Sequence, residues 1–299
     1  MLELRRLRLL RELDHRGTIA AVAQALAFSP SAVSQQLAVL EREAGVPLLE
    51  RTGRRVRLTP AGRNLARHAE ALLERLELAS AELIDARRGL AGPLRIGTFP
   101  TAARAILPAA LIELSRRHPA LEPMVSEIDP AAIGDALRAG ELDVALIHDY
   151  DFVPQASTPG LTVAPLCAES MYLASASPLD APPDQVIARC EAADWITASP
   201  GTACHQMTIR ACQAAGYTPR VRHRIDEFST VLALVAAGQG VALVPHIGTF
   251  DAPPGTVLTR VPIRRRTKVA FRSGGGGHPA VAAITEALRS SVPVGLDAE

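Results

Sequence analysis

The chain has 299 residues, of which 48% are hydrophobic and 21% charged, and its formal net charge at pH 7 is +1. This length predicts two or three domains, and the hydrophobic content suffices for buried cores, which excludes a single small module and a disordered chain. The longest apolar run, residues 231–237, is much shorter than the ~20 residues of a membrane span. Arginines also interrupt the N-terminal leucines where a signal peptide would need an apolar segment. We therefore expect a cytoplasmic protein without a membrane segment.

Charge is distributed unevenly along the chain. Residues 1–90 carry 15 arginines against 11 acidic residues, whereas the remainder is slightly acidic. A basic N-terminal part favours an anionic partner for this region. The four cysteines form no Cys-x-x-Cys pair, which is typical of reduced thiols.

Three short helices are expected within the first 45 residues. Leucines at every third position predict a first helix that ends near Gly17, and Thr18 is the expected N-cap of a second helix. Ser29 followed by Pro30 predicts the start of a third helix, which ends at Gly45. Two helices joined by a tight turn, the second with a start rich in serine and glutamine, are typical of a helix-turn-helix.

A β-hairpin follows, with predicted strands at residues 46–51 and 55–58 and arginines on both arms. This hairpin would form the wing of a winged helix-turn-helix and contact phosphates or the minor groove. The start of the third helix would meet base edges in the major groove, and Thr18 could donate to a phosphate. The alternative is that the serines only cap the helix. The predicted DNA-binding residues are Thr18, Pro30, Ser31, Ser34, Gln35, Arg51, Arg54, Arg55 and Arg57.

Residues 60–88 form the most periodic stretch of the chain, and we expect one long helix there. Its apolar residues alternate in spacing between four and three, which is a heptad seam that favours pairing with a second copy. The alternative is a surface helix packed on its own domain, because Ala66 and Leu73 widen the apolar face. The predicted dimerisation residues are Leu65, Ala69, Leu72, Leu76, Ala79 and Leu83.

From residue 94 onward strands and helices alternate, which predicts an α/β region with a mostly parallel sheet. We expect a single helix over residues 102–117 and another over 183–189. Four of the expected strands cover residues 161–166, 171–175, 257–261 and 269–272.

Enzyme motifs are missing from the sequence. It has no nucleophile elbow, no phosphate-binding loop and no His-Glu-x-x-His, and no histidines stand at metal-ligand spacing. Residues 238–240 read Gly-Gln-Gly, but they follow a helix and precede a strand, so we interpret them as a helix C-cap rather than a nucleotide site. We expect no catalytic residues, no cofactor and no metal.

These motifs resemble a known family. Residues 29–41, 45–51 and 59–62 look like the N-terminal signature of the LysR-type transcriptional regulators. The α/β remainder, including residues 140–145 and 238–245, is similar to their effector domain, which resembles periplasmic binding proteins. One difference is that Pro-Ser follows the serine that starts the third helix, where many members have Gln-Pro.

The resemblance implies a multidomain protein whose domains can be assigned along the chain. Residues 1–58 would be the winged helix-turn-helix and 59–88 the linker helix. The effector region would contain two Rossmann-like subdomains, the first formed by residues 89–165 and 265–299 and the second by 166–264.

The resemblance also implies a function. The protein would be a sequence-specific transcriptional regulator that binds a dyad-symmetric DNA operator, assembles as a dimer or homotetramer, has RNA polymerase as a partner, and responds to a small-molecule effector. A solute-binding transport protein and an enzyme with a fused DNA-binding head are the alternatives from other classes.

By this resemblance, the effector would bind in the cleft between the two subdomains. Turns that lead from a strand into a helix offer N–H groups and hydroxyls to an anion, although each can also be an ordinary N-cap. The acidic members of the set would also suit an amine, so anionic, zwitterionic and basic effectors all stay open. The predicted effector-binding residues are Phe99, Pro100, Thr101, Ile128, Asp129, His148, Asp149, Ser199, Gly201, Thr202, Glu227, Phe228 and Ser229.

Cys204 and Cys212 lie in the stretch where peroxide-sensing members of the family carry two redox cysteines. On a continuous helix, residues eight apart are separated by ~12 Å, beyond the ~7 Å limit for a disulfide. We therefore expect buried, inert thiols.

Overall fold

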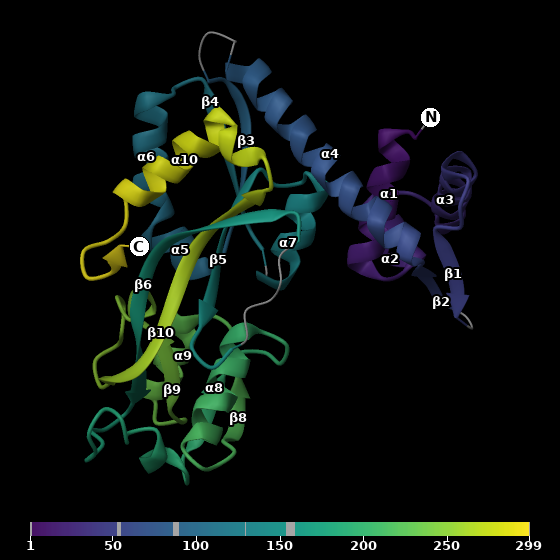
Figure 1. Cartoon of the computed structure of the whole chain (residues 1–299). Coiled ribbons are helices and arrows are strands. Elements are labelled where there is room, and N and C mark those ends of the chain that lie inside the picture. Colours follow the sequence, from purple (N-terminus) through teal and green to yellow (C-terminus); the bar gives the residue numbers. More distant parts are fainter. Residues whose placement is uncertain (1, 53–54, 86–89, 129, 154–158, 299) are drawn as a thin grey trace.

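The computed structural model describes residues 2–52, 55–85, 90–128, 130–153 and 159–298. An N-terminal head is joined by one long helix to a larger body (Figure 1). The head and the helix contain α1 (Leu4–Arg16), α2 (Ile19–Ala25), α3 (Pro30–Ala44), β1 (Leu49–Thr52), β2 (Arg55–Leu58) and α4 (Pro60–Asp85).

The helix boundaries in the head follow from local capping. The Thr18 hydroxyl accepts a hydrogen bond from the Ala21 N–H, and the Ser29 hydroxyl accepts one from the Ala32 N–H. Gly17 and Gly45 close α1 and α3 with φ of 71° and 69°, a conformation that costs glycine little. Leucines and valines of the three helices and the hairpin bury their side chains together against the start of α4. The head is therefore a winged helix-turn-helix, as predicted.

Most strands of the body belong to a mixed seven-stranded sheet with the order β11-β6-β10-β5-β3-β4, in which β9 also pairs with β6. We call the part around β3, β4 and β5 the first subdomain. Its elements are β3 (Gly92–Thr98), α5 (Pro100–Ala105), α6 (Leu107–Arg117), β4 (Leu121–Glu127), α7 (Pro130–Ala139), β5 (Val144–Tyr150), α10 (Pro279–Ser290) and β11 (Asp297–Ala298). Its main core lies between the sheet and helices α5, α6 and α10.

The second subdomain contains β7 (Asp194–Thr197), α8 (Ala203–Ala214), β8 (Arg220–Arg224), α9 (Phe228–Ala236) and β9 (Ala242–Pro245). Strands β7 and β8 are parallel, and Trp195 bridges β7 to Val241 just before β9. Short 3-10 turns η1 (Ala188–Cys190), η2 (His246–Gly248) and η3 (Gly275–Gly277) complete the body. The predicted α/β class with two subdomains is confirmed. The prediction of a mostly parallel sheet is wrong, because four of the six strand pairings in the seven-stranded sheet are antiparallel, all of them involving the long strands β6 and β10.

Two long antiparallel strands connect the subdomains, β6 (Leu161–Ser175) and β10 (Val257–Arg272). The prediction that each is two short strands is wrong, because charged residues that interrupt the apolar pattern are buried as a pair inside the continuous strands. The pairing passes through these residues with register shifts after Val261 and Thr267.

Two predicted helices of the body also differ from the structure. The helix expected over residues 102–117 is divided into α5 and α6 at Ile106, two residues before Pro108, which cannot donate a backbone hydrogen bond. Residues 183–189 contain only turns and the start of η1. Nowhere in the described part of the chain is there a helix long and apolar enough to cross a membrane.

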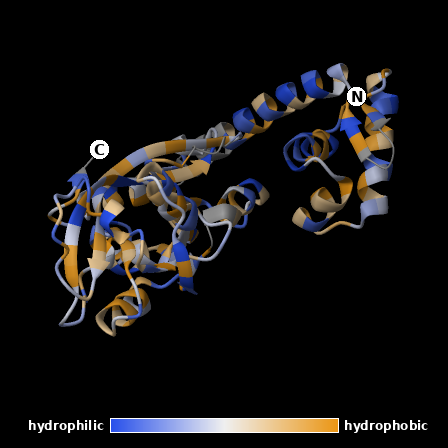
Figure 2. Ribbon diagram, turned by 90° about the horizontal axis from the view of Figure 1, so that it is seen from below, coloured by the Kyte–Doolittle hydropathy of each residue, from blue (hydrophilic) through white to orange (hydrophobic). Residues whose placement is uncertain are grey.

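The long helix α4 packs on the head at its start and on the body in its middle part, where Glu74 and Glu77 lie against Gly274 and Arg272. Figure 2 shows the helix between the two regions. Ala69 is completely buried against the head and Leu65 is half-buried there, so the prediction that the dimerisation seam includes Ala69 is wrong. Leu72 and Leu76 are 51% and 49% exposed, and Ala79 is also exposed. The Leu83 side chain lies outside the described residues. A seam open to a partner therefore begins at Leu72.

Candidate DNA-binding surface and effector cavity

The first two turns of α3 present a polar, exposed face. Pro30, Ser31, Ser34 and Gln35 are all exposed there, and the Ser31 hydroxyl lies 3.0 Å from that of the capping Ser29. These side chains belong to a rigid helix whose opposite face is buried in the head. Such a face can enter a major groove and hydrogen-bond to base edges.

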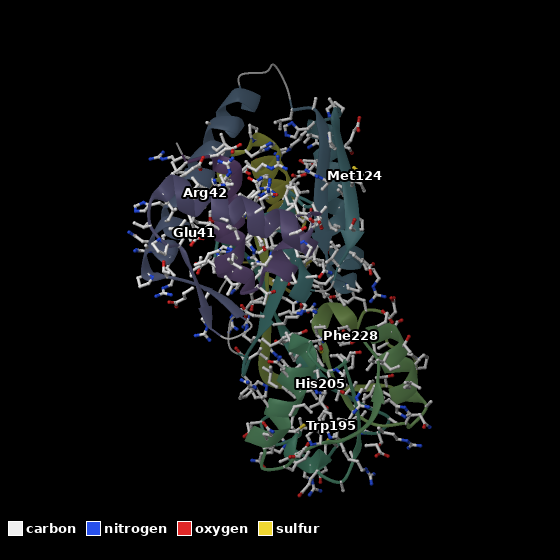
Figure 3. All side chains as sticks on the ribbon, turned by 90° about the vertical axis from the view of Figure 1, so that its right-hand side faces the viewer. Glu41, Arg42, Met124, Trp195, His205 and Phe228 are labelled. Carbon is white, nitrogen blue, oxygen red and sulfur yellow. The ribbon has the colours of Figure 1, made fainter. Side chains whose placement is uncertain are left out.

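The wing is attached to α3 by Glu41. One Glu41 carboxylate oxygen accepts hydrogen bonds from the Leu48 and Leu49 N–H groups, both at 2.9 Å, so the hairpin is fixed relative to the recognition helix. Glu41 lies in the head as Figure 3 shows. Sequence reasoning included it in a family motif without giving it this role.

For the wing and α2, the structure describes the side chains of only some of the predicted DNA-binding residues. Arg57 is exposed on β2, and Thr18 is exposed at the start of α2. Arg54 and the side chains of Arg51 and Arg55 lie outside the described residues.

A charged cluster lies between the head and the body. The Glu12 side chain is fully buried and is paired with Arg11 and with Arg16, whose Nε lies 2.6 Å from Glu12 Oε2. Arg16 also reaches Asp135 of α7 at 2.8 Å, and Arg8 donates to the carbonyl of Ala139. Burial alone would raise the pKa of Glu12, but the two arginines outweigh this effect and hold that pKa below its ordinary value.

A cavity of about 650 Å³ separates the two subdomains of the body. Residues from the starts of α5, α8 and α9 and from the ends of β4 and β5 form its wall. In Figure 3, Phe228 of this wall lies on the side of the second subdomain that faces the first, and Trp195 lies deeper in the second. The volume is that of a typical small-molecule site.

Most of the predicted effector-binding residues lie in this wall. Ser199 and Ser229 do not: their hydroxyls donate to the carboxylates of Asp226 and Glu227, which do line it. Asp129 lies outside the described residues. The predicted residues found in the wall are Phe99, Pro100, Thr101, Ile128, His148, Asp149, Gly201, Thr202, Glu227 and Phe228.

The sequence did not predict the buried ion pair at the floor of the cavity, which is the part of its wall formed by Arg265. Arg265 of β10 is 1% exposed and lies 2.7 Å from Glu169 of β6, which is equally buried. The Arg265 guanidinium also donates to the Thr101 hydroxyl at 3.1 Å, and Glu169 accepts the Ile247 N–H at 2.8 Å. This pair therefore joins α5, both long strands and η2 at one point. In the sequence, Glu169 is the one charge in its strand, whereas Arg265 stands in a run of three arginines that gives no sign of which one is buried.

The other missed wall residues are Glu127, Tyr150, Val153, Ala198, Ala203, Cys204, Gln206 and Asp226. His148 lies between Phe99 and Tyr150, with ring centroids 4.5 and 5.1 Å away. Burial, assisted by the charge of Arg265, lowers the pKa of His148 to about 3, so its imidazole is neutral at physiological pH.

No metal site is formed by the residues that the structure describes, since no three His, Cys, Asp or Glu side chains gather as ligands there. The wall chemistry is instead aromatic, hydroxylic and acidic, which suits recognition of an organic molecule.

Comparison with known proteins agrees with this arrangement. A family profile described as the LysR substrate binding domain matches residues 87–293, and one described as the bacterial regulatory helix-turn-helix protein, lysR family, matches residues 4–63. The chain belongs to the LysR family of transcriptional regulators. As a LysR-type regulator, it combines a DNA-binding head with an effector-binding body.

Individual relatives cover nearly the same length. A probable hydrogen peroxide-inducible genes activator from Mycobacterium avium is 31% identical over 280 residues, which are 86% of this chain and 84% of that protein. A mutant of OxyR from Corynebacterium glutamicum has 28% identity and a TM-score of 0.58 over 97% of this chain and 92% of that one. Full-length CbnR in complex with its target DNA, at 24% identity, has a TM-score of 0.55 over 97% of this chain and 100% of that one, which shows a shared fold.

Proposed function

We propose that this LysR-type regulator binds a dyad-symmetric operator as a dimer or a dimer of dimers, and that an effector in the cavity controls this binding. We place its action in the cytoplasm, with RNA polymerase as a partner at the promoter and without a catalytic role. The proposed division is residues 1–58 for DNA binding, 59–88 for the linker helix, 89–165 with 265–299 for the first subdomain and 166–264 for the second.

The observation that carries the DNA-binding proposal is the exposed polar face at the start of α3 beside a wing fixed by Glu41. Two such faces, paired through the exposed part of α4 from Leu72 to Ala79, would read successive major grooves ~34 Å apart.

Effector control needs a physical connection from the cavity to the head, and β10 offers one. Arg265 at the cavity floor and Arg272 belong to the same strand. Arg272 pairs with Glu77 of α4 at 3.1 Å and donates to the carbonyls of Leu137 and Leu142. A ligand that favours one relative pose of the subdomains would thereby bias the orientation of α4. The ligand must bind the two poses with different affinity to have this effect.

Two substitutions test the DNA-binding surface. Ser34→Ala should chiefly change the preference among operator sequences, because its hydroxyl faces the bases, whereas Arg57→Ala should weaken binding to every duplex and reduce its salt dependence. Fluorescence anisotropy with operator and random duplexes over a salt series measures both effects. Arg116→Ala, on an exposed helix of the body, is the control. Equal affinity of the unsubstituted protein for operator and random DNA would contradict the proposal.

The names of some relatives refer to hydrogen peroxide, but the thiols of this chain favour a different signal. Cys212 is buried as predicted, but Cys204 is only half-buried and lines the cavity, so the prediction of a buried thiol is wrong there. Desolvation raises the pKa of both thiols to about 11, which disfavours the reactive thiolate at neutral pH. Both also lie on the continuous helix α8, as expected.

A further inference from the structure

We propose that the effector is a small organic cation, an amine that is protonated at neutral pH and carries an aromatic or aliphatic body. This inference rests on the proposed function, in which the cavity between the subdomains binds the effector. It goes further because it selects one charge class among those that the sequence leaves open.

The charges around the cavity are mostly negative. In the part of the chain that the structure describes, Glu127, Asp149, Asp226 and Glu227 line it, and Arg265 is the one cation in the wall. Asp149 is neutralised by Lys268 behind the wall. Among the residues that the structure describes, no arginine, lysine or histidine forms an ion pair with the other three carboxylates. An entering cation would therefore meet an excess of negative charge, although α9 and Ser199 already donate hydrogen bonds to Glu227 and Asp226.

Arg265 is not free to bind an anionic ligand. Its Nε and Nη2 atoms both contact Glu169 Oε1, at 2.8 and 2.7 Å, and Nη2 also donates to Thr101. The guanidinium carbon lies 5.2 Å from the centroid of the Phe99 ring. The one positive charge in the wall is thus already matched by a buried carboxylate.

Of the three helix N-termini at the cavity, those of α8 and α9 are capped by side chains, whereas that of α5 has no side-chain cap. At α9, the Glu227 carboxylate accepts the Thr230 N–H at 2.9 Å together with the Ser229 hydroxyl. At α8, the Thr202 hydroxyl accepts the His205 N–H at 3.2 Å. The N-terminus of α9 therefore already holds an anion of the protein itself, which disfavours a second one from a ligand.

The apolar part of the wall fits the body of such a cation. Phe99, Tyr150 and Phe228 supply aromatic rings, and aromatic faces attract ammonium groups. The neutral His148 lies among them, and its buried Nδ1 atom has no hydrogen-bond partner. In the neutral tautomer that leaves this nitrogen unprotonated, it can accept a hydrogen bond from an ammonium group.

The test compares three probes of one shape on the full chain: 2-phenylethylamine, 3-phenylpropionate and 2-phenylethanol. Isothermal titration at pH 7 and low salt should show the amine binding at least about tenfold more tightly than the carboxylate, with the alcohol between them. The double variant Glu127→Gln/Asp226→Asn should lose about tenfold in amine affinity and leave alcohol binding unchanged. Glu122→Gln, an exposed carboxylate on the same strand as Glu127 and outside the wall, is the matched control.

Tighter binding of 3-phenylpropionate than of the amine would overturn the inference and would retain the effector cavity. Binding of none of the probes, or an equal loss in the Glu122→Gln control, would also overturn it. Operator binding by the same preparations is measured in parallel, because a chain that still prefers operator DNA keeps the proposed DNA-binding function even when the cation inference fails.

Discussion

The head and the body each bury one carboxylate completely, and the two regions use it differently. Glu12 of α1 lies where the head meets the body, and one of its arginines extends to Asp135 near the surface. Glu169 of β6 pairs with Arg265, which lines the cavity, and the two side chains are equally buried. A buried charge needs a matched partner in either place, and the second pair is the less exposed, at 1% for each side chain.

This difference in burial predicts how much stability each region loses when one of these charged residues is substituted. In the head, the Arg11 and Arg16 side chains are 8% and 10% exposed, so solvent can compensate for a small part of a lost interaction. At the Glu169–Arg265 pair, where each side chain is 1% exposed, solvent can compensate for much less of a lost interaction. We therefore expect the effects of substitution to fall from the body pair, through Glu12, to the exposed contact with Asp135.

The largest effect is expected for Glu169→Ala. This change leaves the Arg265 guanidinium buried without its counter-charge and should lower the free energy of unfolding of the body by about 3–5 kcal/mol. Urea unfolding monitored by the fluorescence of Trp195 measures the change. In the double variant Glu169→Met/Arg265→Met, both charges are absent and most of the stability should return. A loss below ~1 kcal/mol in the single variant would contradict the enclosure of this pair.

A smaller, pH-dependent effect is expected for Glu12. Its pKa in the folded state lies below the ordinary value of 4.5, so its stabilisation is complete above that pH and is lost as pH falls through the folded-state value. Glu12→Gln should cost about 2 kcal/mol at pH 7 and progressively less toward acid. Unfolding free energies between pH 7 and pH 3 test this, with Glu122→Gln as an exposed control. A difference between Glu12→Gln and the unsubstituted chain that stays constant with pH would contradict the assignment.

The smallest effect is expected for the contact between Arg16 and Asp135. Because the Asp135 side chain is about half exposed, a double-mutant cycle with Arg16→Ala and Asp135→Ala should give a coupling energy of at most about 1 kcal/mol, which decreases with added salt. A coupling energy well above about 1 kcal/mol, or one that does not decrease with added salt, would contradict an exposed contact.

The sequence predicted the head more completely than the body. Thr18 and Ser29 cap their helices as expected, because an N-cap acts on an N–H group only three residues away. The position of the Ser29 cap also fixes where α3 begins, and therefore which residues form its exposed first turns. The sequence predicted only part of the dimerisation seam on α4. A heptad pattern does not distinguish Ala69, which is buried against the head, from Leu72, which is exposed.

In the body, the sequence predicted the turns that enter the cavity and missed its floor. Thr101, Thr202 and Glu227 stand at strand-to-helix turns, which local pattern reveals. Arg265 and Glu169 are 96 residues apart in sequence and interrupt the apolar pattern of their strands, so local reasoning divided each strand in two.

What the sequence by itself determined are the features governed by neighbours along the chain: helix starts and ends, the winged helix-turn-helix and the alternation of strands and helices. The tertiary structure alone decided which charges are paired, which face of α4 stays open and which carboxylates surround the cavity. The physical reason is range, since capping and periodicity act within a few residues, whereas the cost of burying a charge depends on partners that only folding brings together.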